Sequence, residues 1–167
     1  MQSSRQDLLP WMPWAVAPTL AGVSSALSNF AADWDAEREY HFSFFLADKL
    51  VGAGGINRLP PVSGRPAEAE IHYWMHSGFA GRGLATEACR AMLAFAFDSL
   101  QVKEVILLAG EGNLASLRVA EKLGFSFELT SPDGLLGSDG PFPTRHHRLK
   151  RGYLARQQPT EPAAGDS

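Results

Sequence analysis

The sequence predicts one mixed α/β domain whose elements follow the order α-β-β-β-α-β-α-β-β. The first observation behind this prediction is an alternating segment at 69–76, which indicates a strand and leads into a glycine-rich turn. Apolar residues spaced three and four apart then indicate a half-buried helix that ends at about Leu100. A continuous apolar run at 104–109 indicates a central strand, and an amphipathic helix at 113–123 follows it, closed by Gly124.

The N-terminal segments predict a helix and a hairpin. We expect the helix at 18–38, with Thr19 as its N-cap. Short apolar runs at 40–46 and 50–56 predict two antiparallel strands, and the glycines of the second run indicate a bulge or a close approach of another backbone. The aromatic segment at 8–14 contains two prolines and cannot form one continuous helix. We expect it to pack against the domain or to form one wall of a substrate pocket.

The C-terminal third predicts two strands separated by a loop. A strand is expected at 125–130, and the segment 131–143 is so rich in Gly, Pro and Asp that it predicts a mobile loop. The segment 144–153 predicts a last strand, which its many Arg, Lys and His residues place at a solvated sheet edge. The polar tail at 156–167 predicts disorder, which leaves residues 1–155 as a single domain.

The composition argues against several classes of function. A net charge of -3 and a pI near 5.9 give no support for a nucleic-acid partner. The first residues lack the apolar core of a signal peptide and no apolar run reaches membrane-spanning length, so we expect a cytoplasmic protein without a membrane partner. The single cysteine, Cys89, lies in the apolar stripe of a predicted helix and is expected to be a buried structural thiol. No cluster of His, Cys and Asp has metal-ligand spacing, so we expect no metal.

The glycine-rich turn at 78–83 carries the clearest chemical signal. Glycines allow a ligand to approach the backbone closely, and the first turn of the helix that follows presents unpaired N–H groups. A strand, a glycine turn and a helix N-terminus together form an anion site, which predicts a bound pyrophosphate. A P-loop nucleotide enzyme does not fit, because no Lys-Ser or Lys-Thr follows the glycines.

Several motifs together resemble the GNAT superfamily of acyl-CoA-dependent N-acetyltransferases, over roughly residues 40–153. These motifs are Tyr73-Trp74, Ala80-Gly81-Arg82-Gly83-Leu84-Ala85, Thr86-Glu87-Ala88, Asn113-x-x-Ser116 and Leu123-Gly124-Phe125. The resemblance is to the Rim-type branch, the ribosomal-protein N-terminal acetyltransferases. It implies a mixed, mostly antiparallel central sheet flanked by helices, with acetyl-CoA as co-substrate.

The sequence departs from the family pattern in two ways. Ala80 stands where the family usually has Gln or Arg, so one polar contact at the turn is missing. Only seven residues precede Leu8, although family members usually begin with a strand and a helix ahead of the Pro-Trp segment. We therefore expect the N-terminal strand to be missing or truncated.

The resemblance implies which residues bind acetyl-CoA. Backbone groups of the strand before the turn would lie beside the pantetheine, the turn would hold the pyrophosphate, and the second helix would contribute at its start and along its length. The implied cofactor-binding residues are Met75, His76, Ala80, Gly81, Arg82, Gly83, Leu84, Ala85, Thr86, Asn113, Ser116, Arg118 and Lys122. For Arg118 and Lys122, solvated helix charges remain an equal alternative.

The resemblance also implies the catalytic groups. Glu70 occupies the position of a catalytic glutamate on this strand, and His72 lies two residues along on the same face, so either could serve as the base. Ser116 matches a serine that can protonate the departing thiolate. Tyr153 is a late candidate for a tyrosine acid. A backbone N–H near Met75 would face the oxyanion.

The expected function is acetyl transfer from acetyl-CoA to a primary amine, by direct attack on the thioester. A protein N-terminal α-amine is one candidate acceptor, and a small amine, a polyamine or an aminoglycoside is the alternative. A CoA-binding regulatory protein without turnover is a third reading, which the presence of both Glu70 and Ser116 disfavours. A homodimer is compatible with the sequence.

Overall fold

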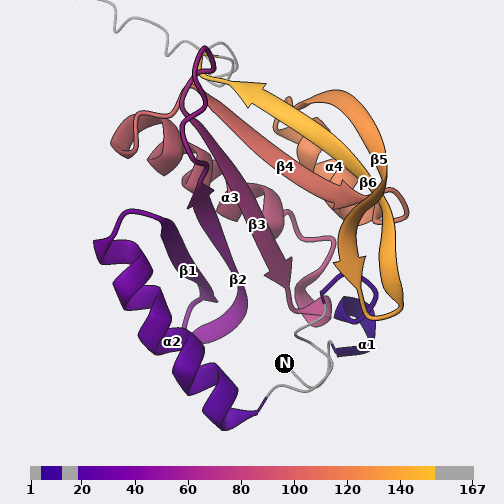
Figure 1. Ribbon diagram of the computed structural model, residues 1–167. Coiled ribbons are helices and arrows are strands. Elements are labelled where there is room, and N and C mark those ends of the chain that lie inside the picture. The colour runs from indigo at the N-terminus through magenta and orange to yellow at the C-terminus, as the bar shows by residue number, and fades with distance from the viewer. Residues whose placement is uncertain (1–4, 13–18, 153–167) are drawn as a thin grey trace, which may run out of the picture.

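The computed structural model describes residues 5–12 and 19–152 (Figure 1). Its helices are α1 (Arg5–Leu8), α2 (Leu20–Asp35), α3 (Leu84–Ala94) and α4 (Leu114–Lys122), with a 3-10 turn at Ser77–Phe79 and a π-helical turn at Phe95–Ser99. Its strands are β1 (Glu39–Leu46), β2 (Lys49–Arg58), β3 (Glu68–Met75), β4 (Glu104–Gly110), β5 (Ser126–Gly137) and β6 (Gly140–Lys150). Tyr153 and the tail at 156–167 lie outside the described residues.

One six-stranded sheet runs in the order β1-β2-β3-β4-β6-β5. Every neighbouring pair is antiparallel except β3 and β4, which are parallel and joined through α3. Parallel neighbours need such a crossover, because both strands must start from the same edge. The prediction of a mixed, mostly antiparallel sheet flanked by helices is confirmed.

The core lies between one face of the sheet and helices α3 and α4, which lie behind the sheet in Figure 1. The alternation along β3 puts Ala69 and Ile71 on this face and Glu68 and Glu70 on the other. The fully buried residues of the core include Ile56, Ile71, Leu93, Val102, Val105, Leu107, Leu123 and Leu149. Cys89 is also fully buried here, as the apolar helical stripe predicted.

Helix α2 lies along the β1 edge of the sheet (Figure 1) and begins where Thr19 caps it. The Thr19 hydroxyl accepts a hydrogen bond from the Gly22 N–H at 3.0 Å, as predicted. Trp34 packs edge-on against Tyr40 near the other end of the helix, with ring centroids 4.9 Å apart. Leu27 of this helix is 60% exposed.

Two predicted contacts are present. In the β1–β2 hairpin, a Cβ at Gly54 would lie 2.6 Å from the His72 carbonyl oxygen, so β2 and β3 meet here without an intervening side chain. At the N-terminus, Trp11 packs edge-on against Phe142 at 5.5 Å and covers Gly110. The aromatic segment therefore packs against the domain through Trp11.

The predicted loop at 131–143 was wrong, because β5 and β6 continue through it as a long hairpin. Register shifts at Phe127/Leu129 and Ser131/Leu135 absorb its Gly, Pro and Asp residues. Thr144 holds the second irregularity, since its hydroxyl accepts from the Leu135 N–H at 2.9 Å and donates to the Phe142 carbonyl. Local composition cannot reveal such pairing across a hairpin.

The prediction that the last strand is a solvated edge was also wrong, because β6 lies between β4 and β5. Arg148 is tolerated inside the sheet because three carboxylates surround its guanidinium: Glu128 and Glu104 accept at 2.6 and 2.7 Å, and Glu68 accepts as well. These bonds, the one to Glu128 foremost, raise the pKa of Arg148. A charged strand can thus lie inside a sheet when neighbouring strands supply its counter-charges.

Candidate active site

The site begins where β3 and β4 separate. Their parallel pairing ends at Ile71 and Leu107, although β3 continues to Met75 and β4 to Gly110. Helices α3 and α4 start shortly after these strand ends, so both helix N-termini lie at this edge of the sheet. Ligands of α/β proteins bind at the carboxyl ends of such strands, in the opening between diverging chains.

The glycine turn forms an open cradle at this edge. Gly81 and Gly83 have φ values of 74° and 79°, and a Cβ at either position would meet nothing within 4 Å. Gly83 is the N-cap of α3 and offers no side chain to its N–H groups. The first-turn N–H groups of α3 are therefore left for an anionic ligand, and the residues present fit a pyrophosphate. The predicted cofactor residues Ala80, Leu84, Ala85 and Thr86 belong to this same turn.

The cationic side chains do not all gather at the cradle. Arg82 lies over the Phe79 ring, with its guanidinium carbon 5.5 Å from the ring centroid. Arg118 lines an open hollow of about 470 Å³ between α4 and β5, whose lining includes none of the predicted catalytic side chains. Lys122 ends α4, about 13 Å along the helix from its start.

We call the opening between β3 and β4 beyond Ile71 and Leu107 the gap. A hydrogen bond joins β3 and α4, the two elements that flank it. The Tyr73 hydroxyl of β3 lies 3.1 Å from the Ser116 hydroxyl of α4. Ser116 is held at the first turn of α4, where its N–H donates to the Asn113 side chain at 3.1 Å, so Asn113 is the N-cap of this helix. Burial, and then the neighbouring Cys89, raise the pKa of Tyr73, so the phenol keeps its proton.

Tyr73 was not among the residues predicted for the site. The alternation of β3 was the available signal, because it places Tyr73 on the helix-covered face beside Ile71. The contact with Ser116 depends on how α4 packs, and sequence spacing does not reveal that.

Glu70 and His72 lie on the face of β3 opposite to the one that α3 and α4 cover. Burial, and then the charge of Glu39, raise the pKa of Glu70. Burial, and then His41, lower the pKa of His72 to about 4. His72 is therefore uncharged near neutral pH, and Glu70 is a carboxylate of increased basicity.

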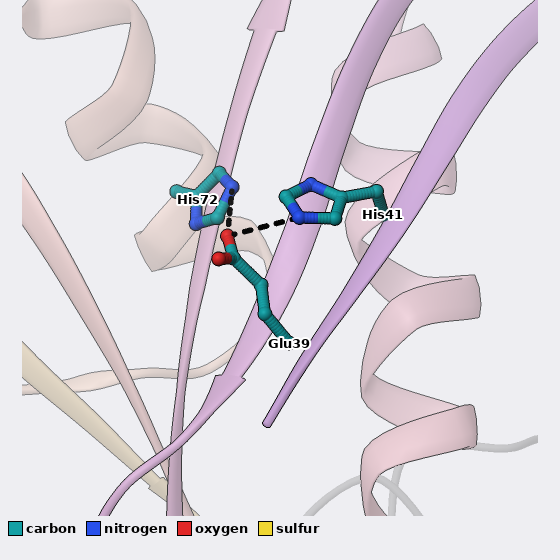
Figure 2. A group of neighbouring side chains, drawn as sticks. All are labelled: Glu39, His41 and His72. Atoms are coloured by element: carbon teal, nitrogen blue, oxygen red, sulfur yellow. Dashed lines mark ion pairs between the residues drawn. The ribbon is translucent and has the colours of Figure 1, made fainter. Parts of the chain in front are cut away.

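Glu39 and His41 of β1 belong to the same polar group as Glu70 and His72. Figure 2 shows them beside His72. One Glu39 carboxylate oxygen lies 3.5 Å from His41 Nε2 and 3.6 Å from His72 Nε2. The sequence prediction included His72 and missed both β1 residues. Their alternation with Tyr40 was the only available signal, and it does not show which strand lies two positions away.

Beyond Ile71, the backbone N–H groups of β3 point alternately toward β2 and toward the gap. The His76 N–H donates to the Val51 carbonyl of β2 at 2.8 Å. N–H groups alternate in direction along a strand, so the Met75 N–H points to the gap side. The His76 ring accepts from the Gly78 N–H at 3.1 Å and so holds the turn that precedes the cradle.

Cys89 is a buried neighbour of Tyr73. Burial raises the pKa of its thiol to about 12, so the reactive thiolate is scarce at neutral pH. In the part of the chain that the structure describes, no helix is long and apolar enough to cross a membrane.

Comparisons with known proteins agree with this geometry. The family model "Acetyltransferase (GNAT) domain" matches residues 1–126. The chain is 30% identical over 138 residues to "Putative ribosomal N-acetyltransferase YdaF" of Bacillus subtilis (strain 168), which covers 79% of this chain and 72% of that protein. It is 30% identical over 112 residues to "Probable N-acetyltransferase YjcK" of the same organism, covering 66% of this chain and 61% of that one.

A solved structure shows the same fold. "Mycobacterium smegmatis RimJ in complex with CoA-disulfide" superposes with a TM-score of 0.81 at 24% identity, over 92% of this chain and 75% of that one. The family match covers most of the chain, and the two diverging strands and the glycine cradle lie within the matched residues. The chain therefore belongs to the GNAT family of acetyltransferases and is an acyltransferase that resembles the ribosomal-protein N-acetyltransferase branch.

Proposed function

We propose that the protein transfers the acetyl group of acetyl-CoA to a protein N-terminal α-amine. The single observation that carries this proposal is the gap beyond Ile71 and Leu107, which has the glycine cradle at its mouth and proton-transfer groups on both sides. Acetyl-CoA supplies an activated thioester when bound. The chain must then bind it, accept the proton of the amine and provide a proton for the thiolate.

Binding falls to the cradle and the separated strands. The pyrophosphate would lie on the N–H groups that follow Gly81 and Gly83, which are open to an anion. The pantetheine would lie along the unpaired side of β3 beyond Ile71, where backbone groups can pair with an extended ligand. The Met75 N–H points to this side and would donate to the thioester oxygen as negative charge develops on it.

Proton transfer would use both faces of the sheet. An amine must lose a proton to attack, and Glu70 is the base we assign, because its burial favours accepting a proton. The amine nitrogen forms a bond to the acyl carbon, the C–S bond breaks, and the sulfur takes the electron pair. Ser116, hydrogen-bonded to Tyr73, would donate the proton that converts the thiolate to the thiol.

The acceptor class is supported by relatives and by charge. YdaF is named as a ribosomal N-acetyltransferase, which supports a protein amine. Glu39 and Glu70 lie on the face from which the amine would approach, and two carboxylates favour a cationic acceptor. The same two carboxylates would attract a polyamine, which is a second candidate acceptor.

Free-thiol release from acetyl-CoA, measured against a panel of peptide N-termini and polyamines, tests the proposal. We expect turnover with peptides that carry a free N-terminus and none with the same peptides blocked at the N-terminus. Turnover confined to polyamines would mean that the acceptor is a polyamine and not a protein N-terminus. CoA binding without turnover on any amine would overturn the proposed reaction.

A further inference from the structure

The cluster of Glu39, His41 and His72 (Figure 2) joins β1 and β3 across the intervening strand β2. His41 of β1 pairs with Gly55 of β2, and Gly55 pairs with His72 of β3, so the two histidines flank a residue without a side chain. A Cβ at Gly55 would lie 2.6 Å from His72 Nε2. The glycine therefore provides the space in which the His72 ring lies over β2, toward His41.

The donor atoms of the cluster have the spacing of a metal site. One ligand atom from each of the three residues lies within 4.8 Å of the others, and the carboxylate oxygen is 3.5 and 3.6 Å from the two Nε2 atoms. In a tetrahedral zinc site with bonds of about 2.0–2.2 Å, ligand atoms are roughly 3.3–3.6 Å apart. The third pair of donor atoms, from His41 and His72, lies within 4.8 Å, so the two rings would have to move closer to bind one ion.

The His41 ring supplies a second observation that favours a bound ion. Its Nε2 is buried and has no hydrogen-bond partner among the described residues, although it faces the Glu39 carboxylate. The ring is held in place by Phe30 of α2, which stacks on it with centroids 3.5 Å apart. A buried polar atom without a partner is uncommon in folded proteins and calls for an explanation, such as a bound ion.

We propose that Glu39, His41 and His72 bind one divalent transition-metal cation of the zinc class. Two imidazoles and one carboxylate are ligands that zinc accepts, and three protein ligands leave a fourth position for water or another donor. The sequence predicted no metal because the ligands come from two strands that are not sequence neighbours. The proposal concerns binding alone, so its test needs no turnover.

Cobalt(II) titration of tag-free, chelator-treated protein tests the site, because tetrahedral cobalt gives a visible absorption band. We expect one equivalent to bind, zinc to displace it, and zinc to raise the melting temperature. His41→Ala and His72→Ala should each weaken cobalt binding by at least about tenfold, since even outer-shell changes cost 10–100-fold. Gly55→Ala should also weaken binding, although it removes no ligand.

His146→Ala is the matched control. His146 is a half-buried histidine of the same sheet that bonds Ser131 at 2.8 Å and lies outside the cluster, so its removal should leave the cobalt affinity unchanged. Circular dichroism of each variant establishes that it is folded. Cobalt binding that does not saturate, or that is equally strong in the folded His41→Ala and His72→Ala variants, would overturn the proposal.

Discussion

Two polar clusters share one face of the sheet, and β3 contributes to both. Glu68 reaches the guanidinium of Arg148, together with Glu104 and Glu128. Two and four residues further along the same strand, Glu70 and His72 belong to the group beside Glu39.

The clusters differ in how well their polar groups are paired. In the first, a single cation meets three carboxylates at hydrogen-bond distance, and its pKa is raised. In the second, His72 stays neutral, the pKa of Glu70 is raised, and His41 Nε2 has no hydrogen-bond partner among the described residues. Paired groups stabilise a fold, whereas incompletely paired ones are available for a proton or a ligand. The difference predicts that the two clusters respond to mutation through different observables.

The largest effect should come from Glu70→Gln. Removing a general base typically costs at least about 100-fold in rate, so kcat/KM for a peptide acceptor should fall by that amount or more. Glu68→Gln is the matched control, because Glu68 lies two residues away on the same face but bonds Arg148. It should lower the free energy of unfolding and leave acetyl transfer unchanged. Equal activity of Glu70→Gln and wild type would end the assignment of Glu70.

Arg148→Met should show the reverse pattern. The change leaves three carboxylates around a side chain that is only 17% exposed, so the free energy of unfolding should fall by about 3–5 kcal/mol. Urea denaturation measures it. Arg90→Met, which removes an exposed pair with Glu87, should cost less than about 1 kcal/mol. Similar losses for both variants would show that the Arg148 cluster does not stabilise the sheet.

The opposite face of β3 offers a third comparison. Tyr73→Phe and Ser116→Ala should each lower kcat by about tenfold, a small effect for proton donation because a thiolate is already a good leaving group. The double variant should be little worse than either single one, since the two hydroxyls act as one unit. Tyr40→Phe, a change at a buried core tyrosine, is the control. Fully multiplicative losses would contradict a shared role.

The smallest effect is expected at Cys89, and it concerns the chemical reactivity of the thiol. Its thiol pKa is raised from 9.0 to about 12, so at pH 8 its thiolate fraction should be about a thousandfold lower than in an unfolded chain. Iodoacetamide should label it in urea and barely at all in the native protein, as mass spectrometry would show. Rapid labelling of the folded protein would mean that the core beneath Tyr73 opens readily.

Much of the local structure follows from sequence patterns. Thr19 was expected as a helix cap and accepts the capping hydrogen bond, and Gly124, expected to close α4, has the positive φ of a helix C-terminus. Each of these helix ends depends only on residues a few positions apart, because a cap is a local arrangement of the backbone. The hairpin at 131–143 was missed because its Gly, Pro and Asp content indicates a loop and does not reveal the pairing of β5 with β6. The interior position of β6 was missed because the partners that stabilise it are far away in the sequence, as with Glu68, 80 residues from Arg148.

Apart from the short helix α1, the sequence by itself determined the order of strands and helices. It also determined the glycine cradle at Gly81 and Gly83 and the family to which the chain is similar. Only the tertiary structure decided which polar side chains meet. Strand order and register place His41 opposite Gly55 and His72, and the packing of α4 brings Ser116 to Tyr73. Alternation specifies the face on which a side chain lies, but its neighbours depend on which strands pair and on where their register begins.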